Sequence, residues 1–226
     1  MDAYRLNLKL YFSPDIRLDR EQIIPIFHRW IRDNRLDEML IDVADYSLVP
    51  SGPGVMLIAH EAHYSLDATD GELGLLYARK RPQAGSFGER LRDAWQRLLT
   101  AGQQLEQEAG LVIPTDRLDL RIQDRLLAPN NDATAAAVEP ELRRLVSEYY
   151  GDVDLDLTPE ADARAGFGLQ AQTPVSPRIA ALLAAGPISE TATRPAATTW
   201  QPGELAGRQV FGRPQKAGAG AADAAH

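Results

Sequence analysis

Alternation of apolar and polar residues in three separate segments is the feature that most limits what this chain can fold into. Residues 4–12 read YRLNLKLYF, in which Leu6, Leu8 and Leu10 occupy every second position. Residues 118–123 (LDLRIQ) and 152–157 (DVDLDL) repeat the pattern. A period of two places successive side chains on opposite faces of a β-strand. Each segment therefore predicts a strand with one buried and one wet face, as in antiparallel or mixed sheets covered by helices on one side.

One long helix is predicted after residue 86. Ser86 and Glu89 have the spacing of a capping box, in which each side chain bonds the other residue's backbone N–H. An apolar stripe that includes Trp95 follows at helical spacing, and Gly110 marks the end.

Two further helices are predicted, and each contains a proline. Asp19 and Gln22 form a second capping-box pattern, but Pro25 predicts a kinked or late first turn because proline lacks a backbone N–H. The other helix ends at residue 150, and Pro140 predicts that its regular part begins near residue 139.

Three strands are expected between the first two helices, at residues 39–44, 55–66 and 73–80. Asp70 and Gly71 in the stretch DATDGE supply the turn of a hairpin between the last two. The resulting order is β-α-β-β-β-α-β-α-β, and omission of one central strand leaves the βαββαβ unit of ferredoxin-like folds. The sequence thus predicts an α+β protein: a two-layer sandwich of a mostly antiparallel sheet with helices on one face, related to the ferredoxin-like plan.

The composition changes near residue 173. Residues 1–172 are predicted to form the α+β globular domain. Residues 173–226 are rich in Pro, Ala, Gly and Thr and hold few large apolar residues. Such a segment buries too little surface to offset the entropy of ordering it, so it is predicted to be a flexible, disordered C-terminal tail.

Charge and cysteine content exclude several classes of function. The net charge is −8, from 32 acidic and 24 basic residues, and nucleic-acid binding needs a surplus of positive charge. No apolar run reaches the roughly 18 residues of a membrane span, and the first residues do not form a secretory signal. The absence of cysteine removes disulfides and thiolate ligands. A cytoplasmic location without membrane or nucleic-acid partners is the default expectation.

The stretch HEAHY at residues 60–64 resembles part of a zinc-protease motif. That motif needs two histidines four residues apart on a helix, whereas His60 and His63 are three apart in a predicted strand. An odd separation sends strand side chains to opposite faces. We therefore expect neither a metal nor a cofactor, and interpret the histidines as polar residues where a strand leaves the core.

Other polar stretches have similarly ordinary interpretations. The loop PSGPG at residues 50–54 leads into a strand, so it lacks the helix N-terminus that phosphate loops use. Asp42 and Asp45 are interpreted as solvated or turn-capping residues. The basic run at residues 79–81 is typical of a hairpin end, although it could hold an anionic ligand.

The sequence contains few patterns typical of catalytic sites. This favours a non-enzymatic accessory or adaptor protein that docks on a larger assembly through its tail. Ile179, Leu182 and Leu183 could form the apolar face of a short binding helix, or could simply cover the home domain. Trp200 and Phe211 are the expected aromatic anchors.

The alternative is a small-molecule-binding domain or enzyme with a site near the central hairpin. Its polar residues would be Asp45, His60, His63 and Arg79, provided that the fold brings them together around a pocket. The sequence leaves the substrate, the partner and a possible homo-oligomer open.

Overall fold

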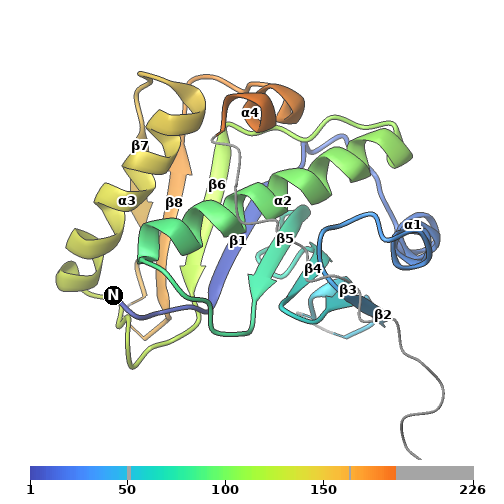
Figure 1. Ribbon diagram of the computed structural model, residues 1–226, viewed down its shortest axis with the longest axis horizontal. Helices are drawn as coiled ribbons and strands as arrows, with labels where there is room; N and C mark the ends of the chain where they lie inside the picture. Colours follow the sequence, from blue (N-terminus) through green and yellow to red (C-terminus); the bar gives the residue numbers. More distant parts are fainter. Residues whose placement is uncertain (50–51, 163, 187–226) are drawn as a thin grey trace, which may run out of the picture. The chain divides into compact units, whose positions relative to one another are not determined.

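The structure is a computed structural model that describes residues 1–49, 52–162 and 164–186 (Figure 1). In chain order its elements are β1 Leu6–Tyr11, α1 Arg20–Asp33, β2 Leu40–Tyr46, β3 Gly54–Ala59, β4 Ala62–Asp67, β5 Gly74–Arg79, α2 Phe87–Ala109, β6 Arg117–Ile122, α3 Asp132–Tyr150, β7 Asp156–Pro159, β8 Phe167–Gln172 and α4 Ile179–Ala185. None of the described helices is long and apolar enough to cross a bilayer.

The strands form one sheet in the order β2-β3-β4-β5-β1-β6-β8-β7, in which every neighbouring pair is antiparallel. The central strand β1 places Leu6, Leu8 and Leu10 on the covered face, as the alternation predicts. The predicted α+β class and the antiparallel sheet are confirmed.

The strands differ from the sequence-based prediction in three places. Residues 55–66 do not form one strand but two, β3 and β4, joined by a tight turn at His60 and Glu61, so four strands lie between α1 and α2. Strand β8 was not predicted, although its sequence FGLQAQ alternates apolar Phe167, Leu169 and Ala171 with Gly168 and two glutamines. The period-two segment at residues 152–157 becomes a strand only from Asp156 onwards.

Both predicted capping boxes are present, at Asp19 and at Ser86. The predictions drawn from the prolines are wrong. Helix α1 begins at Arg20 and continues through Pro25, and α3 begins at Asp132, well before Pro140. An internal proline removes one backbone hydrogen bond, and burial of the apolar face on both sides of each proline keeps the helix continuous.

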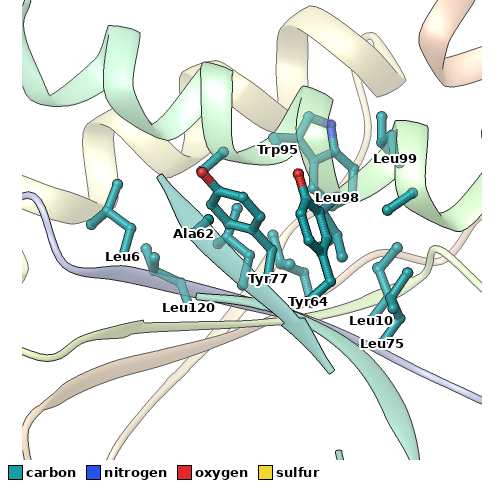
Figure 2. Packing of buried hydrophobic residues seen from close by; sticks show 14 of the residues in the cluster. Leu6, Leu10, Ala62, Tyr64, Leu75, Tyr77, Trp95, Leu98, Leu99 and Leu120 are labelled. Atoms are coloured by element: carbon teal, nitrogen blue, oxygen red, sulfur yellow. The ribbon is translucent and has the colours of Figure 1, made fainter. Parts of the chain in front are cut away.

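A single hydrophobic core lies between the sheet and the helices. Figure 2 shows Trp95 of α2 above Tyr64 and Tyr77, with Leu6 and Leu120 beneath the helix. Trp95 is only 1% exposed, so the stripe recognised in the sequence is the face that α2 buries.

The helices cover one face of the sheet (Figure 1). Trp30 of α1 donates from Nε1 to Glu108 of α2 at 2.7 Å, and Arg92 of α2 pairs with Glu148 of α3 at 2.8 Å.

Helix α4 belongs to the same compact unit as the elements before it. Ile179 and Leu182 are buried, and Leu183 packs against the core. Gly102 of α2 makes room for α4, because a Cβ there would lie 2.8 Å from the Ile179 Cδ1 atom.

Candidate functional site

The structure separates the four residues predicted for a hairpin site. Arg79 lies on the helix-covered face of β5, whereas His63 pairs with Ala78 on the opposite face. His60 lies in the β3–β4 turn. Asp45 lies opposite Val55, at the far end of β3 from that turn. These four side chains therefore do not converge on one pocket.

Asp45 and His63 each have a local role. Asp45 accepts hydrogen bonds from the backbone and side chain of Ser47, which lower the pKa of its carboxyl group. Asp42 accepts from the backbone N–H of Val43 at 2.8 Å. The interpretation of both aspartates as solvated or turn-capping residues agrees with these contacts. Burial, with Lys80 nearby, lowers the pKa of His63, whose Nδ1 atom has no partner.

Arg79 belongs to a chain of buried and half-buried charges that we call the hairpin network. It joins the β3–β4 turn to α2 and to the loop before β2, and its members are Glu38, Glu61, Tyr64, Tyr77, Arg79, Asp93 and Arg97.

Arg79 is the centre of the hairpin network. Its guanidinium lies 3.2 Å from Asp93, 3.3 Å from Glu61 and 3.3 Å from the Tyr77 hydroxyl. Asp93 also accepts from Arg97 at 2.9 Å, one helical turn along α2. Two carboxylates thus compensate an Arg79 side chain that is 4% exposed, as a buried charge requires.

Glu38 closes the network at its most buried end. Its side chain is 3% exposed, its Oε1 atom accepts from the Tyr64 hydroxyl, and the same atom lies 3.5 Å from Arg97. The Oε2 atom is buried and has no hydrogen-bond partner. A buried carboxylate oxygen without a protein donor costs free energy.

Tyr64 and Tyr77 of the hairpin network hold their phenol protons more tightly than exposed tyrosines do. Their rings meet edge to face, with centroids 5.3 Å apart, and Figure 2 shows both hydroxyls pointing toward α2. Burial raises the pKa of Tyr77 to about 12 and, with the nearby Glu38 carboxylate, raises the pKa of Tyr64 as well. Burial acts to lower the pKa of Arg97, but attraction to Asp93 outweighs it and that pKa is raised. Neither phenol is suited to act as a base at neutral pH.

A second polar cluster, which sequence reasoning missed, lies on the other face of the sheet. The Lys9 ammonium contacts Asp67 at 2.9 Å, Asp70 at 2.6 Å and the Glu72 carbonyl at 2.8 Å. Tyr11 also donates to Asp70, at 2.8 Å. All three donors of the ammonium are therefore used, and the cluster ties the β4–β5 loop to β1. In the sequence its only signal was a lysine in the middle of a strand.

Metal and phosphate sites find no support in the described residues. There, no three histidine, aspartate or glutamate side chains gather in a way that could hold a metal ion. The loop before β3 ends at Gly54, whose φ is +66° and where a Cβ would lie 2.1 Å from the Leu66 carbonyl oxygen. This glycine serves a close backbone contact with β4, as only glycine can.

A small cavity lies between α3 and the sheet. Trp95, Tyr150 and Asp116 are among its lining residues, and its free volume is about 10 Å³, close to the minimum for one water molecule. The buried Nε1 atom of Trp95 has no protein partner. The cavity can therefore hold a water molecule but is too small for a substrate.

Large apolar side chains are exposed at one edge of the sheet. Strand β2 and the residues that flank it carry what we call the β2-edge patch, whose members are Met39, Ile41, Tyr46, Leu48 and Val49. Leu48 is 83% exposed and Met39 is 68% exposed. Single exposed apolar residues are ordinary on a protein surface, whereas several around one edge strand favour an interaction surface.

The residues predicted to bind a partner fall into two groups. Ile179 and Leu182 are buried against the home domain, so they are not accessible while α4 stays docked. Trp200 and Phe211 lie outside the described residues, and their role as anchors stays a prediction.

The chain matches no protein-family model and no curated protein. Its function is therefore inferred from the geometry of its own residues, in which charged groups are paired inside and apolar groups are exposed at the β2 edge.

Proposed function

We propose that this protein is a non-catalytic accessory protein that contacts another protein chain through the β2-edge patch, as part of a larger assembly. The observation that carries the proposal is the exposure of five large apolar side chains around one edge strand. Each square ångström of apolar surface removed from water contributes roughly 25 cal/mol, so a partner that covers the patch gains binding free energy.

The state of the charged residues supports a non-catalytic role. Arg79 and Lys9, the most buried cations of the two polar clusters, are both compensated by carboxylates of their own domain. A catalytic site needs groups that converge on a substrate-sized pocket. The hairpin network instead connects elements of the fold to one another.

The strand order supports the finer description of the fold. The strands β6-β1-β5-β4 are consecutive neighbours, and α1 and α2 are the two crossover helices between them in the chain. This arrangement fits a βαββαβ unit that carries the hairpin β2–β3 as an insertion after α1. On this view the β2-edge patch is borne by the inserted hairpin, in a two-layer, ferredoxin-like related domain. We place its action in the cytoplasm, as the cysteine-free sequence predicts.

Photocrosslinking in the native host tests the proposal. A photoreactive amino acid is placed at Leu48 in the patch or, as a matched control, at Leu126, which is 95% exposed in the loop before α3. We expect irradiation to give discrete protein adducts from position 48 that are absent from position 126. Equal adduct patterns at the two positions, or none at position 48, would contradict the proposal.

The tail hypothesis is tested by the same assay. If Trp200 and Phe211 anchor the protein on its assembly, a Trp200→Ala/Phe211→Ala variant should lose adducts that the Leu48 position forms with the assembly. Unchanged adducts would remove the tail from the proposed function.

A further inference from the structure

We infer that Asp42 and Asp45 guard the β2 edge against strand addition, so that the β2-edge patch stays exposed without joining the sheet to another chain. The inference goes beyond the proposed function, because it concerns the backbone of β2, whereas the proposed function rests on the exposed side chains. It gives the two aspartates one shared role at the open edge of the sheet.

An unguarded β2 would be a site of self-association. It is a terminal strand of the described sheet, paired with β3 on one side. Large apolar side chains lie on and beside it, among them Met39, Ile41 and Leu48. An apolar edge strand with free backbone N–H and C=O groups is a template for pairing with other chains. A chain that exposes this patch therefore gains from a closed backbone beside it.

Asp42 occupies one backbone donor of the edge. Its Oδ1 atom accepts the Val43 N–H at 2.8 Å. The N–H groups along an edge strand alternate between the neighbouring strand and the open side, and a donor that bonds a side chain belongs to the open side. The Asp42 side chain is itself exposed. An incoming strand would have to displace this carboxylate and remove it from water, which costs free energy.

Asp45 closes the end of the strand in the same way. Its carboxylate accepts the Ser47 N–H at 2.9 Å and also the Ser47 hydroxyl. Arg20 of α1 lies 3.6 Å from the other carboxylate oxygen. These contacts hold a second negative charge over a second backbone donor, directly after the last residue of β2.

An irregularity in β2 adds to the guard. The pairing with β3 shifts between Leu40 and Asp42, which face the adjacent residues Ala59 and Ile58. Ile41 therefore has no partner of its own on β3, as in a β-bulge. Bulges and charged side chains are devices by which natural edge strands avoid pairing, and β2 combines both.

The opposite edge of the sheet is closed by different means. Strand β7 spans 4 residues, Asp156–Pro159, and its proline has no N–H to donate. Loss of the two aspartates thus opens the β2 edge alone, and any new strand pairing is assigned to that edge.

Removal of both carboxylates tests the guard. In Asp42→Ala/Asp45→Ala the Val43 and Ser47 N–H groups lose their acceptors. We expect sedimentation velocity to show oligomers at a protein concentration at least about tenfold lower than for the wild type, since each freed N–H adds an intermolecular hydrogen bond. Infrared spectra of these oligomers should contain the band of intermolecular β-sheet. The single change Asp42→Ala, a smaller perturbation of the fold, should produce part of the same effect.

Two control variants separate the hydrogen bonds from the loss of charge. Asp42→Asn/Asp45→Asn has the same net charge as the alanine variant but retains an oxygen acceptor for each N–H, so it should associate far less. Asp15→Ala/Asp152→Ala removes two exposed carboxylates from other loops and should behave as the wild type. Circular dichroism and melting temperature confirm that each variant is folded.

The inference is overturned if the folded alanine variants stay as monomeric as the wild type, or if the alanine and asparagine double variants associate equally. Wild-type oligomers that carry the intermolecular β-sheet band would also overturn it, because the edge would then be open. None of these outcomes affects the crosslinking at Leu48, which decides the proposed function separately.

Discussion

The hairpin network holds charged residues inside the protein, whereas the β2-edge patch exposes large apolar residues to water. Both lie in the same half of the sheet. Arg79 in the network is 4% exposed, whereas Leu48 beside β2 is 83% exposed. Two carboxylates surround the buried guanidinium, while no contact within the described domain removes Leu48 from water. Buried charge that is paired serves the fold, and exposed apolar surface that is unpaired indicates binding.

The comparison predicts that changes in the hairpin network act on stability, whereas changes in the β2-edge patch act on association. The largest effect is expected for Arg79→Ala. Removal of the guanidinium leaves Asp93 and Glu61 uncompensated, and loss of one partner from a buried pair costs about 3–5 kcal/mol. Both carboxylates are partly exposed, so we expect the lower end of that range in urea unfolding.

The matched control is Arg144→Ala, whose side chain is 62% exposed and pairs with Glu141 on the surface of α3. It should change the free energy of unfolding by less than about 0.5 kcal/mol. Equal effects of the two substitutions would show that the hairpin network does not support the fold.

Alkaline stability gives the next largest effect. The pKa of Tyr77 is raised to about 12 by burial, against about 10 in an unfolded chain. From pH 10 to 12 the unfolded state loses the phenol proton first, so stability falls as pH rises, by roughly 2 kcal/mol for this group. In melting experiments from pH 10 to 12, the Tyr77→Phe variant should therefore lose less stability than the wild type, by the contribution of this phenol.

Tyr46→Phe, at the exposed edge, should leave the alkaline loss as in the wild type. If the Tyr77→Phe profile also coincides with the wild-type profile, burial of Tyr77 does not contribute to alkaline unfolding.

A similar or slightly smaller effect is expected for Tyr64→Phe. The Tyr64 hydroxyl donates to Glu38, whose other oxygen has no partner, so its loss should cost about 1–2 kcal/mol. Replacement of both residues, Tyr64→Phe with Glu38→Leu, should recover part of that loss because no buried carboxylate remains. This account would be contradicted if the double variant lost more free energy of unfolding than the two single variants added together.

The smallest effect on stability is expected for Leu48→Ser. A side chain this exposed gains little from the fold, so the free energy of unfolding of the monomer should change by no more than about 0.5 kcal/mol. The same variant should weaken association. If Leu48→Ser strongly lowers the free energy of unfolding and leaves association unchanged, Leu48 supports the fold. The contrast between the β2-edge patch and the hairpin network would then not hold.

The elements that could be predicted from the sequence are those with a local cause. The period of two in residues 4–12 needs only the pleat of a strand, and β1 is buried on the predicted face. The capping boxes at Asp19 and Ser86 depend on residues three apart. Trp95 lies in a stripe whose spacing is that of a single helix.

Where local signals competed with packing, the prediction failed. Pro25 and Pro140 disfavour helix locally, yet burial of the neighbouring apolar residues keeps α1 and α3 continuous. The turn at His60 was hidden because the apolar residues on both sides of it suggest one continuous strand. Strand β8 does carry a local alternation of two, in FGLQAQ, which was overlooked.

The sequence by itself determined the α+β class, the central strand, the capped helices and the acidic, cysteine-free character of this protein, because each depends on spacing or composition alone. Only the tertiary structure decided that Arg79 meets Asp93 and Arg97 of α2, and that Glu38 meets Tyr64 across 26 residues. It also decided that Met39, Ile41 and Leu48 lie at a sheet edge. The order of the strands in the sheet is set by contacts between segments that are distant in the sequence. The exposure of a side chain depends on whether its strand lies at the edge of that sheet.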